Sequence, residues 1–115
     1  MDRFDVMRDL LARSRYFKLV CGAGNENVDE VRRLALIYTL AGATGFDVSA
    51  TPRVVEACVE GIELAYGHAS GLGKEIPIRP FITVSVGMPG DHHVRKAFIV
   101  DDCVACGKCI PVCPT

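Results

Sequence analysis

The stretch Phe46-Asp47-Val48-Ser49-Ala50-Thr51-Pro52 decides the fold of this chain. Its first five residues predict a short β-strand with one buried face, because apolar and polar side chains alternate there. Thr51 has the side chain of a helix N-cap, and Pro52 suits the first helical position. The predicted helix carries an apolar stripe, formed by Val55, Cys58, Ile62 and Ala65. A strand that leads into an amphipathic helix is the unit from which parallel α/β sheets are built.

The preceding segments predict a second unit of the same kind. Residues 3–13 predict a short amphipathic helix, and residues 17–21 predict a buried strand. Asn27 and Glu30 have the spacing of a capping box, which starts a helix that should end at Gly42. The order is therefore helix, strand, helix, strand and helix before the chain reaches residue 67.

The downstream residues complete the pattern. Residues 67–73 predict a loop, and residues 79–86 predict a third strand with Pro80 near its start. Strands that alternate with helices, roughly thirty residues apart, predict an α/β fold with βαβ units and a parallel sheet. Three strands are too few to close an eight-stranded barrel, which needs at least about 200 residues. We therefore expect residues 1–90 to form either a TIM-barrel-like start, as the first part of a larger domain, or a small open sheet.

Four cysteines close to the C-terminus carry the strongest chemical signal. Their spacing is C-x2-C-x2-C-x3-C-P, formed by Cys103, Cys106, Cys109, Cys113 and Pro114. This is the spacing with which bacterial ferredoxins bind iron–sulfur clusters, so all four are expected to bind a 4Fe-4S cluster. Residues 91–115 are thus predicted to begin a ferredoxin-type module, entered through an apolar strand over residues 97–100.

The fourth cysteine of this spacing usually binds the other cluster of a two-cluster protein. Cys103, Cys106 and Cys109 then lack one ligand, and no second cysteine run follows before Thr115. We expect the module to be truncated and to hold its cluster weakly in this chain, with one or two clusters in the full-length protein.

Zinc and disulfide bonds are the alternatives for these cysteines. A structural zinc site usually takes two separated C-x2-C pairs, and disulfides suit a secreted chain. The N-terminus has no apolar core of a secretory signal, and no apolar run reaches transmembrane length. With a net charge of −1, the chain has no excess of basic residues that would indicate binding to nucleic acid or to an anionic membrane. A cytoplasmic protein with reduced thiols is expected.

Two further features of the sequence bear on function. Gly22-Ala23-Gly24 lies between a strand and a helix, but Asn27 leaves the dinucleotide fingerprint incomplete, so a tight turn is the preferred interpretation. Cys21, Asp47, Ser49 and Ser85 fall at or near strand ends, where α/β proteins bind ligands. Core packing is the preferred interpretation for Cys21 and explains Cys58 fully.

The chain also resembles a known family. Phe17-Lys18-Leu19-Val20-Cys21-Gly22-Ala23, residues 33–43 and residues 46–50 resemble the LdpA (light-dependent period) family of cyanobacteria. Val84-Ser85-Val86 and the segment from Arg95 through the cysteines do so as well. The resemblance implies an iron–sulfur protein that senses cellular redox state and feeds light input to the circadian clock. It also implies a protein longer than this chain.

Two functions from different classes follow. The first is redox sensing or electron transfer without catalysis of its own, with a redox partner or regulatory protein as its target. The second is an α/β oxidoreductase in which the cluster relays electrons and Cys21, Gly22 and Asp47 bind a flavin or a substrate.

Overall fold

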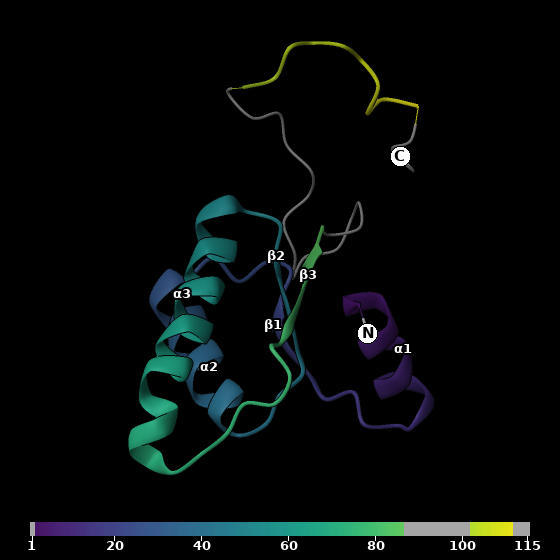
Figure 1. Ribbon diagram of the computed structural model, residues 1–115. Helices are drawn as coiled ribbons and strands as arrows, with labels where there is room; N and C mark the ends of the chain where they lie inside the picture. Colours follow the sequence, from purple (N-terminus) through teal and green to yellow (C-terminus); the bar gives the residue numbers. More distant parts are fainter. Residues whose placement is uncertain (1, 87–101, 112–115) are drawn as a thin grey trace.

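The computed structural model describes residues 2–86 and 102–111 of the chain. Its elements are α1 (Arg3–Ala12), β1 (Lys18–Gly22), α2 (Val28–Leu40), β2 (Gly45–Ser49), α3 (Pro52–Ala69), the 3-10 helix η1 (Ser70–Leu72) and β3 (Phe81–Ser85) (Figure 1). The predicted strand over residues 97–100 and the predicted domain boundary at residues 90 and 91 lie outside the described residues.

The strands form a parallel sheet in the order β1-β2-β3. Phe46 of the central strand is in register with Leu19 of β1 and Ile82 of β3. Helices α2 and α3 lie side by side on one face of this sheet, while α1 lies on the opposite side (Figure 1). The predicted α/β fold with βαβ units is therefore confirmed for the described residues.

The core fills the space between β2 and the two neighbouring helices. Phe46 and Val48 are completely buried, and each such side chain contributes about 1.5–3 kcal/mol through removal from water. Their partners in the hydrophobic cluster are Val31 and Ala35 of α2, Ala43, and Val54, Cys58 and Ile62 of α3. The prediction that Cys58 is a core residue is confirmed.

At the start of α2, only one of the two hydrogen bonds of the predicted capping box forms. The side chain of Asn27 accepts a hydrogen bond from the backbone N–H of Glu30 at 3.1 Å, as expected for an N-cap. The backbone N–H of Asn27, however, donates to Oδ1 of Asn25 at 3.0 Å, which occupies the place of the Glu30 carboxylate in a full box. Gly42 has φ +101° after the last helical residues, as a glycine stop requires.

Helix α3 is longer than its sequence suggests. A loop was expected from Gly67 onward, but the helix continues to Ala69 and ends only after η1, at Gly73 with φ +66°. A glycine inside a helix costs about 1 kcal/mol, and burial of Ala65 and Ala69 on either side of Gly67 offsets that cost. The prediction of a loop at residues 67–69 is therefore wrong.

Gly61 sets the distance between α2 and α3. A Cβ atom at this position would clash with the carbonyl oxygen of Arg32 and lie 2.6 Å from Cβ of Ala35. Both obstacles are rigid parts of α2, so the two helices can pack this closely only because residue 61 has no side chain.

The substitution Gly61→Ala should lower the free energy of unfolding by about 1–3 kcal/mol, because it overpacks the helix contact. Gly67→Ala is the matched control in the same helix, since nothing lies within 4 Å of its added Cβ atom. That control should raise the free energy of unfolding by about 0.5–1 kcal/mol. Urea denaturation of both variants measures the difference, and equal effects would contradict the proposed close packing.

Thr39 buries a hydroxyl group without a hydrogen-bond partner. The residue is 1% exposed, and its Oγ1 atom is unpaired within the described structure. A buried unpaired hydroxyl destabilises the folded state. Thr44 is its counterpart, because its Oγ1 atom accepts from the Phe17 N–H at 2.7 Å and donates to the Phe17 carbonyl at 3.1 Å.

We therefore expect opposite effects from two chemically identical substitutions. Thr39→Val should raise the free energy of unfolding by about 1 kcal/mol, while Thr44→Val should lower it by about 0.5–1.5 kcal/mol, because it removes two exposed hydrogen bonds. Thermal and urea denaturation provide the comparison. A loss of stability in Thr39→Val would show that its hydroxyl has a partner in solution.

Candidate functional site

The cysteine segment is described over residues 102–111, drawn in yellow in Figure 1. Cys103, Cys106 and Cys109 are free and exposed. Cys113, the fourth predicted ligand, lies outside the described residues. The described segment thus presents three accessible thiols within seven residues, and soft thiolates are the ligands that iron–sulfur clusters use.

The backbone of this segment has two left-handed residues. Ala105 has φ +56° and Gly107 has φ +73°, and both flank Cys106. The N–H of Ala105 points at Sγ of Cys103, at a distance of 3.4 Å. Hydrogen bonds from the backbone to cysteine sulfur stabilise thiolate charge and tune the potential of a bound cluster. The positive φ of Gly107 is a conformation that glycine adopts readily.

The three described thiols are not drawn together as a finished site. Among residues 2–86 and 102–111, no group of three or more His, Cys, Asp or Glu side chains is placed to hold a metal ion. The donor chemistry and the loop backbone fit a cluster, whereas convergence of the sulfur atoms is not seen in this part of the chain.

Cys21 and Cys58 belong to a different environment. Both pack in or against the core between the sheet and the helices. Burial raises the pKa of the Cys58 thiol to about 12, and the nearby Cys21 adds to this effect. Burial also raises the pKa of Cys21, helped by the negative charges of Glu30 and Asp47. Thiols with raised pKa values are poor nucleophiles and poor metal ligands near neutral pH.

Alkylation should separate the two groups of cysteines. We expect iodoacetamide at pH 8 to modify Cys103, Cys106 and Cys109 rapidly in the metal-free protein. Cys58 should stay unmodified until the chain unfolds, because its pKa of about 12 leaves almost no thiolate at that pH. Peptide mass spectrometry of a time course measures each rate. Modification of Cys58 as fast as Cys103 in the folded protein would contradict this assignment.

The predicted ligand site at the strand ends is only partly assembled. Cys21 faces the helices, whereas Asp47 faces away from them, because side chains alternate along a strand and Phe46 and Val48 fill the core. Asp47 instead meets two side chains from the neighbouring strands. Its Oδ1 accepts from Oγ of Ser85 at 2.5 Å, and its Oδ2 lies 3.3 Å from Nζ of Lys18.

Lys18 was not selected from the sequence, although strand alternation could have indicated it. Lys18 stands one residue before Leu19, as Asp47 stands one residue after Phe46, so both belong to the face opposite the core. Ser49 is 3% exposed and does not reach Asp47. Its hydroxyl lies 3.0 Å from that of Thr51, which donates to Glu26 at 2.9 Å and ties two loops together.

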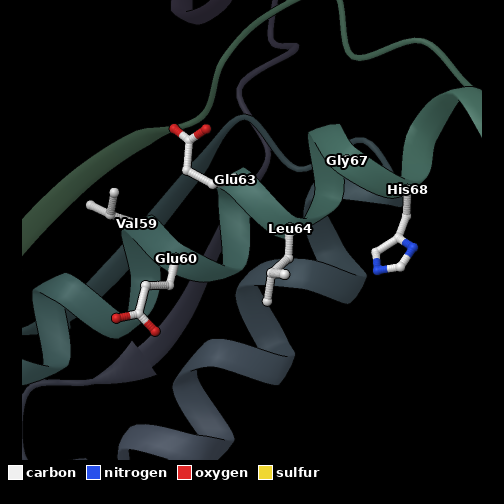
Figure 2. A pocket seen from close by; sticks show the side chains of 6 residues that line it. All are labelled: Val59, Glu60, Glu63, Leu64, Gly67 and His68. Carbon is white, nitrogen blue, oxygen red and sulfur yellow. The ribbon is translucent and has the colours of Figure 1, made fainter.

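A hollow on the outer surface of α3 is a weaker candidate. Figure 2 shows its lining residues, all of which come from this one helix. Its carboxylates already have partners, since Glu60 binds Arg32 at 2.8 Å and Glu63 binds Arg79 at 2.6 Å. Without convergent groups from other elements, this hollow has no chemistry of a ligand site.

No helix in the described part of the chain is long and apolar enough to cross a membrane.

Comparison with known proteins gives one relative. Light dependent period A from Synechococcus elongatus is 31% identical to this chain over an alignment that covers 92% of this chain and 36% of that protein. This chain therefore spans about a third of the length of its curated relative. No family model and no solved structure matches. The chain is thus related to the light-dependent period (LdpA) family over the region that it spans, and the resemblance predicted from its sequence is confirmed.

Proposed function

We propose that this protein is a redox-responsive iron–sulfur protein whose cysteine segment binds a 4Fe-4S cluster. Cys103, Cys106 and Cys109 would bind three iron corners, and Cys113 would bind the same cluster or a second one. A change in the oxidation state of the cluster, or its loss, would alter the contact with a redox partner or regulatory protein. The relative's name connects that protein with a light-dependent period, and we propose a related output here.

The observation that carries this proposal is the cysteine spacing together with the exposure of its thiols. Three cysteines at successive x2 spacing are all accessible, while the other two described cysteines are withdrawn into the core region. The N–H of Ala105 next to Cys103 Sγ adds a donor that a sulfur-bound cluster would use. A zinc site explains the spacing less well, because zinc usually takes two separated pairs.

Anaerobic reconstitution with iron and sulfide tests this assignment. The 115-residue chain should turn brown with charge-transfer absorption and lose this absorption readily to a chelator, as expected for weak binding. Cys106→Ser should abolish the absorption, because it removes the central ligand of the three. Cys21→Ala is the matched control and should leave the absorption unchanged, since Cys21 packs against the core.

Two results would contradict the proposal. One is a colourless protein that takes up zinc but no iron under the same conditions. The other is equal cluster content in Cys106→Ser and in the unsubstituted chain. Stable, stoichiometric iron in the 115-residue chain would instead overturn only the expectation that a ligand is missing.

A second function is supported by the polar contacts of the sheet. An α/β oxidoreductase would use the cluster as an electron relay and bind a flavin or a substrate on the α/β part. The contacts of Asp47 with Lys18 and Ser85 favour this function, whereas Cys21 faces away from them. A flavin would leave a yellow chromophore after acid removes the cluster, and absence of that chromophore would exclude the flavin version.

A further inference from the structure

The face of the sheet opposite α2 and α3 is divided into two chemically different halves. Parallel sheets are normally covered on both faces, so this second face needs an explanation. Its amino-terminal half is covered by apolar side chains and by α1. The rest of this face presents Asp47 of β2 and Ser85 of β3, and the long side chain of Lys18 reaches Asp47 from the start of β1.

Aromatic rings and an arginine close the amino-terminal half. Gly45 has the Tyr16 ring directly against it, and the ring centroids of Tyr16 and Phe81 are 6.4 Å apart. The guanidinium group of Arg3 lies 3.8 Å from the centroid of the Phe81 ring. It also donates to the carbonyl of Arg79 at 2.6 Å and that of Pro80 at 3.2 Å. These contacts hold α1 over the amino-terminal end of the sheet, on the face opposite α2 and α3 (Figure 1).

Asp47, the middle residue of β2, lies at the centre of this polar group. Lys18 of β1 and Ser85 of β3 reach it from opposite sides, and Thr83 of β3 is its register partner. The side chain of Asp47 is 16% exposed and that of Lys18 is 35% exposed, so both remain accessible to a small molecule. Val20, which is in register with Asp47, is 63% exposed and adds an apolar surface beside the polar groups.

The hydrogen-bonding capacity left in this group defines its ligand. The carboxylate of Asp47 can accept at further lone-pair sites, and the ammonium of Lys18 has two N–H donors beyond its ion pair. Ser85 donates its proton to Asp47, so its oxygen remains free to accept. The Lys18–Asp47 pair has no net charge, which disfavours phosphate or another strong anion. Hydroxyl groups both donate and accept, and they match this balanced set.

We propose that Lys18, Asp47 and Ser85 form a binding site for a neutral polyhydroxylated small molecule, such as a sugar or the ribose of a nucleoside. Asp47 accepts from ligand hydroxyls, Lys18 donates to a ligand oxygen, and Ser85 accepts from a third hydroxyl. Val20 packs against the carbon-bound hydrogen atoms of the ligand. The site lies on the α/β part and does not involve the cysteine segment, so its failure would leave the proposed cluster unaffected.

Titration of the 115-residue chain, followed by amide NMR spectra, tests the site. The probes are D-ribose, D-glucose and myo-inositol, each alone, with sodium phosphate as the charged comparison. At least one polyol should shift the amide signals of Lys18, Asp47 and Ser85 in a saturable way, with a dissociation constant on the order of millimolar or lower. Phosphate should not saturate these signals.

Three variants make the result specific. Asp47→Asn and Ser85→Ala should each weaken polyol binding about tenfold, because the first replaces an acceptor oxygen with an N–H2 donor and the second removes a hydroxyl group. Glu75→Gln, an exposed position in the loop before β3, is the control and should bind as the unsubstituted chain does. If Asp47→Asn fails to fold, Ser85→Ala decides the outcome alone.

Three outcomes would overturn the proposal. The first is the absence of saturable shifts with every polyol. The second is saturation by phosphate at the same amides, which would identify an anion site. The third is unchanged polyol affinity in the folded variants at Asp47 and Ser85.

Discussion

The contact between α2 and α3 at Gly61 is the constraint on which the rest of the structure depends. Because residue 61 has no side chain, the backbone of α3 reaches the Arg32 carbonyl and the Ala35 methyl group of α2. Two helices this close fit together on one face of three short strands. They bury Phe46 and Val48 completely and leave the opposite face of the sheet to other partners.

This one-sided core separates the chemistry of the chain into distinct regions. Cys21 and Cys58 lie where burial raises their pKa values, and they are suited to packing rather than to metal binding. Charged and hydroxyl groups gather on the other face around Asp47. Cys103, Cys106 and Cys109 are exposed in a segment of irregular backbone, with a backbone N–H directed at sulfur. The cysteines at the core and the cysteines of the exposed segment thus lie in different environments.

Local signals predicted the elements well, whereas contacts between elements could not be predicted. Asn27 and Pro52 start helices as expected, because caps and proline act within one turn of backbone. The predicted end of α3 at Gly67 is wrong, because Ala65 and Ala69 are buried against the rest of the fold and the helix continues past the glycine. Such burial is a tertiary effect. The ion pair of Lys18 with Asp47 joins residues 29 positions apart and depends on strand register. The spacing of the cysteines predicts iron–sulfur ligation, which stays a prediction, and it did not indicate the left-handed backbone at Ala105.

The central claim is that the cysteine segment binds an iron–sulfur cluster. Mössbauer spectroscopy of the anaerobically reconstituted chain, prepared with ⁵⁷Fe, tests it most directly because the spectrum reports the ligands and valence of every iron atom. We expect iron in a sulfur-coordinated cubane with delocalised valence, reduced by added dithionite. A spectrum that contains only adventitious iron bound through oxygen or nitrogen, with no sulfide in the protein, would contradict it.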